Sequence, residues 1–373
     1  MAKCIFVAGA RPNFMKIAPI LREAKKYDDF ETLLVHTGQH YDHNMSKSFF
    51  EDLGIKEPEY HLGCGGGSHA EQTASVMVKF EKLCIDVKPD FVLVVGDVNS
   101  TIAAGLVAKK LKVKLIHVEA GLRSGDRDMP EEINRLATDA ITDIFFTTEK
   151  NGTENLLKEG QSKGKVHFVG HVMIDNLYYQ MERLNEYTPL ELVKNIRSAL
   201  PKQYFCMTMH RPSNVDNKDT LVKLLGALKE ISEKTPIVFP CHPRTKKMIE
   251  QFGLGDSFGV YDGQEKIETG IILTDPLGYN DFLYIWKDCV GMLTDSGGLQ
   301  EETTALQIPC LTMRENTERP ITVEVGTNIL IGLDTSLMRR EAENILNESF
   351  KKGAIPEFWD GKASERIISV INS

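Results

Sequence analysis

The sequence of 373 residues predicts an α/β fold with two Rossmann-like domains and a cleft between them, and three observations lead to this class. The chain is longer than the ~250 to 300 residues at which one hydrophobic core usually divides, so we expect two domains. Short apolar runs alternate with helical patterns along the whole chain, which is typical of parallel α/β layers. A polar helical stretch over 176–200, followed by Pro201, separates two series of these runs.

The first series contains six apolar runs that we expect to form strands. They lie at 4–8, 32–36, 90–95, 114–119, 143–148 and 166–170. Between them the apolar residues follow the period of a helix. In the first expected helix these positions are Phe14, Ile17, Ala18 and Leu21.

The second series predicts five more strands, and together the two series set the expected domain boundaries. The runs lie at 204–210, 237–242, 271–276, 290–295 and 309–313. We expect an N-terminal domain over 1–172 and a C-terminal domain over 173–355. The segment 356–373 is expected to form a C-terminal helix that could pack on either domain, including back on the first.

Charge and cysteine content exclude several classes of protein. With 44 basic and 53 acidic residues the net charge is −9, which argues against nucleic acid as the main partner. Seven cysteines without a CxxC pair predict buried thiols in a reducing cytoplasm, and neither a zinc site nor a disulfide framework is expected. The apolar run at 4–10 is too short for a signal peptide, and no run reaches the ~18 residues that span a bilayer.

The stretch over 290–313 predicts a strand, a tight turn, a short helix and a second strand. Ser296, Gly297 and Gly298 form the turn, and the bare N–H groups at the start of the helix attract a phosphate. Glu301 and Glu302 follow within two helical turns, where a carboxylate could accept hydrogen bonds from the hydroxyls of a ribose. The alternative is that the glycines only form a tight turn and the glutamates only favour the helix dipole.

Polar residues follow the expected strands of the first half, where ligands bind in open parallel sheets. Arg11 and Lys16 follow the first strand, and Asp97 follows the third. The fourth strand and its loop supply His117, Glu119, Arg123, Glu131, Glu132 and Arg135. The sequence lacks a GxGxxG motif, so no dinucleotide cofactor is expected.

The second half repeats this arrangement. The residues concerned are His210, Arg211, His242, Arg244, Arg314, Glu318 and Arg319. A single carboxylate after a strand is more often a helix cap, and a single histidine is more often a structural hydrogen-bonder. Together, however, the groups would place carboxylates of one domain opposite phosphate-binding elements of the other across a cleft.

Seven motifs together resemble the non-hydrolysing UDP-N-acetylglucosamine 2-epimerases, in order and over essentially the whole chain. They are GARPNFMK (9–16), TGQHYD (37–42), VVGDVNST (94–101), HVEAGLRSGDRDMPEEINR (117–135), the His210-Arg211 pair, LTDSGGLQEE (293–302) and TMRENTERP (312–320). The resemblance implies the two-domain glycosyltransferase-B architecture and the interconversion of UDP-N-acetylglucosamine and UDP-N-acetylmannosamine. It also implies a homodimer, and neither a cofactor nor a metal.

The resemblance assigns roles to residues that match the family's motifs. The implied catalytic residues are Asp97, Glu119, Glu131 and His210. The implied UDP-binding residues are Arg11, Ser296, Gly297, Gly298 and Glu302. Basic residues beside them are expected to contact the UDP-sugar as well, namely Lys16, Arg135, His242 and Arg314.

The implied reaction restricts the chemistry at the sugar. The hydrogen on carbon 2 is not next to a carbonyl, so a base cannot remove it to form an enolate, and no nicotinamide site is visible to oxidise carbon 3. Elimination remains: UDP leaves carbon 1 while a carboxylate takes the carbon 2 proton, and UDP then adds back. Which carboxylate performs each proton transfer stays open.

The sequence departs from the family pattern in several places. Asn13 stands where many members have glutamate, and Pro212-Ser213 replaces an arginine and a glutamate. Gln39 and His40 are retained, but Asp42 and the loop over 63–73 do not match the site where a second substrate molecule activates some members. We therefore do not expect such activation.

These departures leave room for a related UDP-sugar, such as a 2,3-diacetamido uronic acid or a deoxy sugar. The sequence is also compatible with a hydrolysing epimerase, a glycosyltransferase of the same architecture and a catalytically silent nucleotide-sugar sensor.

Overall fold

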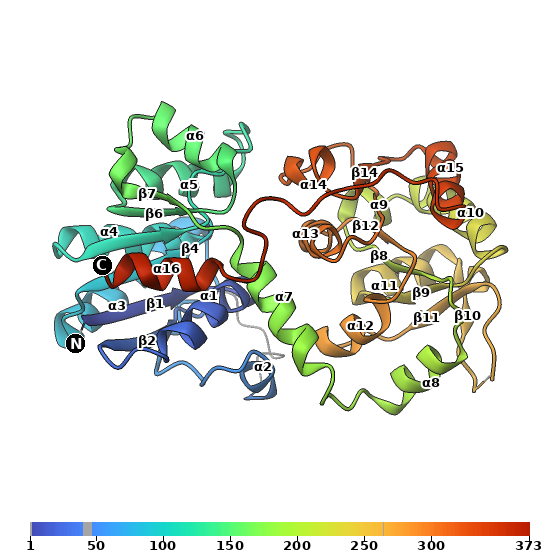
Figure 1. Cartoon of the computed structure of the whole chain (residues 1–373), viewed down its shortest axis with the longest axis horizontal. Helices are drawn as coiled ribbons and strands as arrows, with labels where there is room; N and C mark the ends of the chain where they lie inside the picture. The colour runs from blue at the N-terminus through green and yellow to red at the C-terminus, as the bar shows by residue number, and fades with distance from the viewer. Residues whose placement is uncertain (1, 40–46, 264) are drawn as a thin grey trace. The chain divides into compact units, whose positions relative to one another are not determined.

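The computed structural model describes residues 2–39, 47–263 and 265–373, and it divides the chain into two compact units (Figure 1). Unit 1 contains Met1–Tyr179 and Glu357–Ser373, and unit 2 contains Gln180–Pro356. Each unit is built on its own parallel sheet of seven described strands. The predicted α/β class with two parallel-sheet domains is therefore confirmed.

The sheet of unit 1 has the strand order β3-β2-β1-β4-β5-β6-β7. Its strands are β1 (Ala2–Ala8), β2 (Phe30–His36), β3 (Tyr60–His61), β4 (Phe91–Val95), β5 (Lys114–Val118), β6 (Ile144–Thr147) and β7 (Val166–Phe168). All neighbouring strands pair in parallel. The chain winds outward from β1 in one direction and from β4 in the other. Loops at this switch point diverge and leave room for a ligand.

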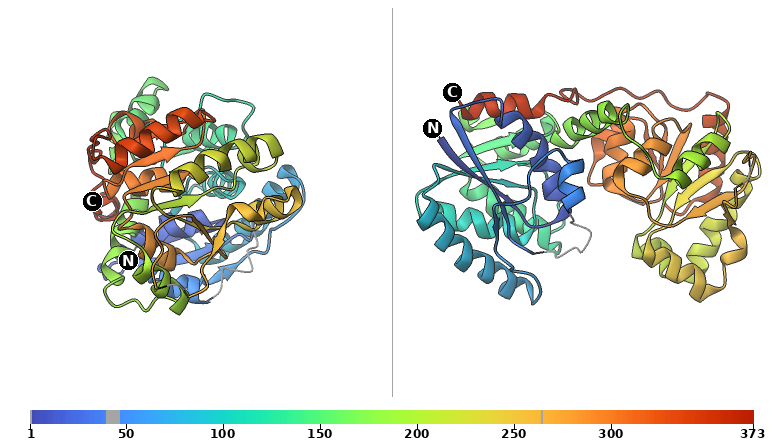
Figure 2. Two further views of the ribbon diagram at one scale, coloured as in Figure 1. Left: turned by 90° about the vertical axis from the view of Figure 1, so that its right-hand side faces the viewer. Right: turned by 90° about the horizontal axis from the view of Figure 1, so that it is seen from below.

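Helices cover both faces of this sheet. They are α1 (Arg11–Ala24), α2 (Lys47–Asp52), α3 (His69–Val87), α4 (Asn99–Lys110), α5 (Pro130–Ile141), α6 (Lys150–Lys158), α7 (Val172–Arg183) and α16 (Ala363–Ile371), with a 3₁₀ turn at Lys163–Lys165. Alternate residues of β1 point to opposite faces. Phe6 packs in a core with residues of α1 and α16, whereas Ile5 packs in a second core with residues of α3 and α4. Figures 1 and 2 show α16 alongside α1.

Unit 2 repeats this design with the order β10-β11-β9-β8-β12-β13-β14. Its strands are β8 (Phe205–Thr208), β9 (Ile237–Pro240), β10 (Gly259–Val260), β11 (Ile271–Thr274), β12 (Gly291–Thr294), β13 (Cys310–Thr312) and β14 (Asn328–Leu330). The winding direction changes between β8 and β12. The residues that follow these two strands therefore lie at the switch point of unit 2.

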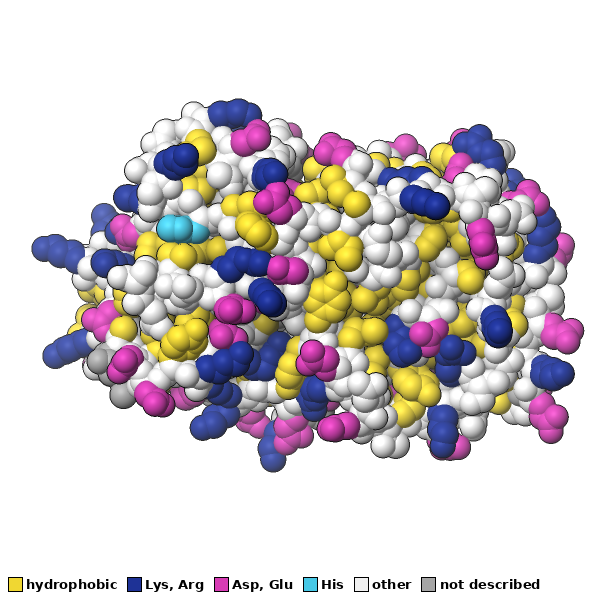
Figure 3. Space-filling model, viewed as in Figure 1, with side chains coloured by type: hydrophobic (Ala, Val, Ile, Leu, Met, Phe, Trp, Pro, Cys, Tyr) yellow, Lys and Arg dark blue, Asp and Glu magenta, His cyan; other side chains and the backbone are white. Residues whose placement is uncertain are grey.

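The helices of unit 2 connect these strands. They are α8 (Glu191–Ala199), α9 (Pro212–Val215), α10 (Lys218–Ser232), α11 (Pro243–Phe252), α12 (Tyr279–Trp286), α13 (Gly297–Ala305), α14 (Pro320–Glu324) and α15 (Thr335–Leu346), with a 3₁₀ turn at Gly255–Ser257. No described helix is both long and apolar enough to cross a membrane. On the face that Figure 3 shows, basic and acidic side chains are intermingled.

All eleven strands that the sequence predicts are present, and β3, β10 and β14 were missed. These three strands contain only two or three residues. A run of that length shows no periodicity that could separate a strand from a loop. All three lie at outer edges of the sheets, where a strand has one neighbour at most.

The two units divide within α7, whereas the sequence analysis placed the junction at the start of that helix. Val172, Ile174 and Leu177 are buried, and Val172 belongs to the core of unit 1. The first two turns of α7 are therefore part of unit 1, and the division falls after Tyr179. The segment from Glu357 onward also belongs to unit 1.

Asp175 on α7 holds the start of α16. Its carboxylate accepts hydrogen bonds from the backbone N–H of Ala363 at 3.1 Å, from the N–H of Ser364 at 2.7 Å and from the Ser364 hydroxyl at 2.7 Å. These N–H groups have no partner within the helix, so a carboxylate there stabilises α16. Burial raises the pKa of Asp175 above its ordinary value even though the hydrogen bonds oppose this shift.

Replacing Asp175 with alanine is expected to destabilise the docking of α16 by about 1 to 3 kcal/mol, because two buried helix N–H groups lose their acceptor. The matched variant Asp175→Asn keeps an acceptor oxygen and is expected to lose less. Hydrogen exchange of the amides of α16 measures the effect. Equal protection of α16 in the wild type and in Asp175→Ala would show that this cap does not hold the helix.

Candidate functional site

Four of the predicted residues of unit 1 follow the carboxyl ends of its central strands. Arg11 begins α1 after β1, and Lys16 lies in the same helix. Asp97 follows β4 and Glu119 follows β5. The Lys16 Nζ lies 2.5 Å from Glu119 Oε2, with side chains 13% and 4% exposed. This pair joins the loop after β5 to the first helix at the switch point.

Glu119 has an unusual backbone conformation. Its φ is +69°, in the left-handed region where residues other than glycine pay about 1 kcal/mol or more. Gly96, which precedes Asp97, also has a positive φ of +65°. A Cβ on Gly96 would lie 3.4 Å from Lys16 Nζ, so glycine leaves room for the Lys16–Glu119 pair. Strain of this kind is often found at functional sites.

Asp97 is paired with Arg135 of α5. The Arg135 guanidinium contacts Asp97 Oδ2 with one nitrogen and Glu132 Oε2 with the other. Glu132 also accepts backbone N–H groups of Ser124 at 3.0 Å and Gly125 at 3.2 Å. Burial alone raises the pKa of Glu132, but these N–H groups and Arg135 leave it below its ordinary value. The group therefore fixes the loop that precedes α5.

The structure distinguishes the two adjacent glutamates at the start of α5. Glu132 is buried within the ion-pair group, whereas Glu131 is partly buried and has no hydrogen-bond or ion-pair partner among the described residues. Consecutive residues of a helix point about 100° apart, so the two carboxylates cannot share one position. Glu132 holds the loop, and Glu131 remains available for another contact.

A buried group lies next to the loops of Asp97 and Glu119. The sequence analysis named its members His117 and Arg123 without giving them a role, and it missed Asp139. His117 contacts Asp139 Oδ1 through Nδ1 at 2.7 Å and the Gly96 carbonyl through Nε2 at 2.9 Å. Asp139 Oδ2 accepts the N–H of Gly121 at 3.0 Å and contacts Arg123 at 2.8 Å. His117 and Asp139 thus connect the backbone on both sides of the candidate catalytic carboxylates. The only sequence signal was a histidine inside an apolar strand.

In unit 2 a buried aspartate organises the corresponding edge of the sheet. Asp295 follows β12 and is fully buried. Its carboxylate contacts His210 Nδ1 at 2.9 Å and accepts the N–H of His210 at 3.0 Å and of Arg211 at 2.9 Å. Burial on its own raises the pKa of Asp295, but His210 and these N–H groups leave it below its ordinary value.

His210 is oriented by this contact. Its side chain is 42% exposed, and with Nδ1 held by Asp295 its Nε2 is the nitrogen left for a ligand. The centre of the His242 ring lies 5.6 Å from the centre of the His210 ring. His242 Nδ1 accepts the N–H of Arg244 at 3.2 Å, so its Nε2 carries the proton. Burial, together with the charges of His210 and Arg244, lowers the pKa of His242.

The start of α13 offers the predicted phosphate site. Ser296 is the N-cap residue, but its side chain makes no capping hydrogen bond. A Cβ added to Gly297 or Gly298 would meet no atom within 4 Å, so the surface over the helix start is open. N–H groups without a side-chain cap, together with a serine hydroxyl at a helix N-terminus, suit a phosphate. Glu302 lies farther along the same helix and is buried.

Comparison with known proteins identifies the family of this chain. The family model described as UDP-N-acetylglucosamine 2-epimerase matches residues 22–372. The chain belongs to this family. A UDP-N-acetylglucosamine 2-epimerase of Methanocaldococcus jannaschii is 40% identical over 99% of this chain and 98% of its own. A UDP-2,3-diacetamido-2,3-dideoxy-D-glucuronate 2-epimerase of Pseudomonas aeruginosa is 37% identical over 98% of each chain.

Solved structures of epimerases are also similar. The crystal structure of the Methanocaldococcus jannaschii UDP-GlcNAc 2-epimerase in complex with UDP-GlcNAc and UDP has a TM-score of 0.81 at 40% identity, covering 100% of this chain and 99% of that chain. The enzyme of Neisseria meningitidis bound to UDP-GlcNAc has a TM-score of 0.82 at 28% identity over 99% of each chain.

The structure gives a role to Asn13, one of the departures from the family pattern, and to the retained Gln39. Asn13 Oδ1 accepts the N–H groups of Gly9 at 3.0 Å and Ala10 at 2.9 Å, so it closes the turn between β1 and α1. Gln39 Oε1 accepts the N–H and the hydroxyl of Ser100, which ties β2 to α4. His40 and Asp42 lie outside the described residues. The absence of second-site activation stays a prediction.

Three arginines that the sequence analysis expects to contact the UDP-sugar already have partners within the protein. They are Arg11, Arg135 and Arg314. The Arg11 guanidinium lies 5.1 Å from the centre of the Phe49 ring. Arg314 binds Glu318 through two hydrogen bonds of 2.8 and 2.7 Å. Arg211 and Arg314 also line a cavity of about 250 Å³. A substrate role for these arginines stays a prediction for this family member.

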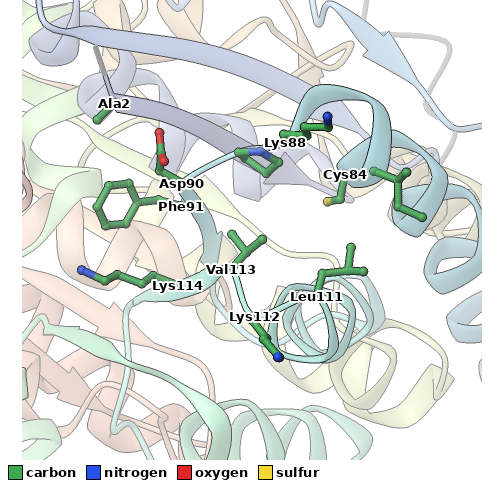
Figure 4. Close-up of a pocket in the computed structure, with 11 residues that line it drawn as sticks. Ala2, Cys84, Lys88, Asp90, Phe91, Leu111, Lys112, Val113 and Lys114 are labelled. Atoms are coloured by element: carbon green, nitrogen blue, oxygen red, sulfur yellow. The ribbon is translucent and has the colours of Figure 1, made fainter.

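A larger cavity of about 810 Å³ lies elsewhere in unit 1 (Figure 4). Its lining includes Ala2, Phe91 and Lys114, which begin β1, β4 and β5. It is therefore at the amino edge of the sheet, opposite the edge that carries Asp97 and Glu119. Among residues 2–39, 47–263 and 265–373, no three His, Cys, Asp or Glu side chains are grouped so that they could hold a metal ion.

The pairing of Glu318 with Arg314 predicts a pH-dependent contribution to stability. Arg314 lowers the pKa of Glu318 from 4.5 to about 2. A carboxyl group whose pKa is lower in the folded state than in the unfolded state stabilises the folded state at pH values above the unfolded pKa. This contribution is lost as the pH falls from about 4.5 to 2. The difference in free energy of unfolding between the wild type and Glu318→Gln is therefore expected to shrink from pH 5 to pH 2.

Urea unfolding is measured by fluorescence in a Trp359→Phe background. Trp286 is then the remaining tryptophan, so the signal reports the unfolding of unit 2. Glu343→Gln is the control, because its ion pair with Lys234 is exposed and such pairs contribute little. If the difference in free energy of unfolding between the wild type and Glu318→Gln stays constant from pH 5 to pH 2, the ion-pair account is contradicted.

Proposed function

We propose that this protein interconverts UDP-N-acetylglucosamine and UDP-N-acetylmannosamine. The observation that carries the proposal is the similarity over the whole chain to the Methanocaldococcus jannaschii epimerase, whose structure was solved with UDP-GlcNAc and UDP. The candidates Asp97 and Glu119 follow β4 and β5, and His210 follows β8, so they lie beyond the carboxyl ends of central strands in their own sheets. No dinucleotide fingerprint is present in the sequence, and the reaction proposed here needs no redox cofactor.

Unit 2 supplies the groups that hold the nucleotide. The open start of α13 at Ser296, Gly297 and Gly298 suits the diphosphate, because N–H groups and the helix dipole favour negative charge there. Glu302 accepts hydrogen bonds from the ribose. The oriented Nε2 of His210 donates to the departing UDP and stabilises its developing charge. Arg11, a residue of unit 1, is a further candidate for contacting the diphosphate.

Unit 1 supplies the groups that move protons. Asp97, Glu119 and Glu131 are the carboxylates for this work. Lys16 lies 2.5 Å from Glu119, and the Arg135 guanidinium contacts Asp97, so a cation holds each of these carboxylates in position. The buried His117 and Asp139 keep the two loops in place.

The proposed reaction balances without an oxidant. A carboxylate takes the proton from carbon 2, the pair of electrons in that C–H bond forms the carbon 1 to carbon 2 double bond, and the bond from carbon 1 to the UDP oxygen breaks. UDP leaves with its electron pair. In the reverse step a protonated group delivers a proton to the opposite face of carbon 2, and UDP reforms its bond to carbon 1. One intermediate therefore gives both epimers.

Two further features complete the proposal. We infer a homodimer, which the exposed apolar residues Val78 and Ile85 support, because they lie seven residues apart on one face of α3. A mass near one chain of 41.9 kDa in analytical ultracentrifugation would contradict the dimer. We also infer a reducing cytoplasmic compartment, which the seven buried free cysteines support.

Replacing a catalytic group by a neutral side chain of similar shape is expected to lower turnover by about 100-fold or more, the usual contribution of acid–base groups. The variants are Asp97→Asn, Glu119→Gln, Glu131→Gln and His210→Asn. UDP affinity is expected to change less than turnover in the three carboxylate variants. Proton NMR of the product formed from UDP-N-acetylglucosamine measures turnover, and calorimetry measures UDP affinity.

Glu154→Gln is the matched control, because Glu154 is an exposed residue of α6 in the same unit. A variant with near-normal turnover removes its residue from the mechanism. If the wild type converts only a UDP-2,3-diacetamido uronic acid, the substrate of the Pseudomonas aeruginosa relative applies instead. Release of free N-acetylmannosamine would indicate a hydrolysing enzyme, and binding without any product would indicate a sensor.

A further inference from the structure

We propose that Tyr279 recognises the nucleotide's ribose together with Glu302, and that the two residues select ribose over 2′-deoxyribose. The inference rests on the proposed function, because it assumes a bound UDP-sugar. It concerns a residue to which neither the motifs nor the resemblance assigns a role. Tyr279 acts here as a substrate-binding residue and does not take part in the proton transfers.

The geometry places a tyrosine hydroxyl on a buried carboxylate. Tyr279 is the first residue of α12, directly after the loop that leaves β11. Glu302 lies in the second turn of α13, and only 4% of it is exposed. The Tyr279 hydroxyl donates a hydrogen bond of 2.9 Å to Glu302 Oε1. Two helices that follow different strands therefore meet at this pair.

The direction of the hydrogen bond follows from the protonation state. Burial, together with the negative charge of Glu302, raises the pKa of Tyr279 well above its ordinary value. The phenol therefore keeps its proton, and the carboxylate can only accept it. An ionised carboxylate can accept about four hydrogen bonds, and the phenol oxygen can accept as well as donate. The bond between Tyr279 and Glu302 therefore does not by itself use all the acceptors of the pair.

These acceptors match a ribose. The 2′- and 3′-hydroxyls lie on neighbouring carbons and each can donate one hydrogen bond. With Oε1 held by Tyr279, the carboxylate keeps one orientation, so its second oxygen and the phenol oxygen occupy fixed positions. Fixing an acceptor before binding reduces the entropy that is lost when the ligand binds.

The neighbouring residues support Glu302 as the acceptor rather than Glu301. Glu301 Oε1 lies 2.5 Å from Arg319 Nε, so the preceding carboxylate is neutralised by an arginine. Glu302 Oε1 accepts a hydrogen bond from the phenol of Tyr279. Gly297 and Glu302 are five residues apart, or roughly 7 to 8 Å along the helix. This separation suits a diphosphate at the helix start and its ribose one turn and a half farther along.

The test compares two probes, UDP and 2′-deoxy-UDP, by calorimetry. Tyr279→Phe is expected to weaken UDP binding by about 10-fold, the effect of losing one hydrogen bond to a charged group. Binding of 2′-deoxy-UDP is expected to weaken clearly less, so the preference for UDP falls. With UDP-N-acetylglucosamine as substrate, KM is expected to rise while kcat stays nearly constant.

Two further variants make the test specific. In a Glu302→Gln background Tyr279→Phe is expected to have a smaller effect on UDP binding, because the two residues act as one unit. Tyr284→Phe is the control: this tyrosine lies on the same helix, and its hydroxyl makes no hydrogen bond among the described residues. The control is expected to leave both affinities unchanged.

The outcomes separate this inference from the proposed function. If Glu302→Gln weakens UDP binding but Tyr279→Phe changes neither the UDP affinity nor the preference over 2′-deoxy-UDP, the inference is overturned and the proposed function stands. If Glu302→Gln leaves UDP affinity unchanged, the ribose assignment and this inference both fail. The product assay with UDP-N-acetylglucosamine decides the epimerase activity independently of either result.

Discussion

A buried aspartate at the carboxyl edge of each sheet holds the loops that carry the candidate catalytic groups. Asp139 in unit 1 and Asp295 in unit 2 each bind a histidine Nδ1, at 2.7 and 2.9 Å, and backbone N–H groups from a neighbouring loop. A buried carboxylate is costly unless hydrogen bonds and positive charges compensate it. Because each aspartate has these partners, burial does not leave it protonated, and its pKa stays below the ordinary value. The loops are thereby fixed relative to their own sheet before any ligand binds.

The two aspartates differ in what they leave accessible. Asp139 binds His117, which is fully buried and contacts the Gly96 carbonyl, so this histidine only supports the backbone beside Asp97. Asp295 binds His210, which is partly exposed and can reach a ligand through Nε2. The same pairing therefore serves a structural role in unit 1, and in unit 2 it leaves a histidine nitrogen for the substrate-binding role that we propose for His210.

Much of this arrangement could be predicted from the sequence, because parallel sheets place the residues after each strand at one edge. The apolar runs indicated the strands of both sheets, and the Ser296 to Gly298 turn indicated the start of α13. Three features could not be found in this way. Glu131 and Glu132 are adjacent and chemically identical, so the residue pattern does not separate them; the resemblance selects Glu131, and the contacts show that Glu132 is the one paired with Arg135. His117 was named among the polar residues of the fourth strand, but nothing in the sequence indicated its pairing with Asp139. Tyr279 begins a helix that no motif marks, and its partner Glu302 is 23 residues away in the sequence.

The central claim of the account is that UDP leaves and returns while a carboxylate exchanges the carbon 2 proton. The most direct measurement is proton NMR of the reaction with UDP-N-acetylglucosamine in deuterated water, without added nicotinamide. Because a carboxylate at a solvent-accessible site exchanges its proton before UDP returns, the account predicts deuterium at carbon 2 of the product and at no other carbon. Product that forms at the full rate and keeps its original hydrogen at carbon 2 would contradict it.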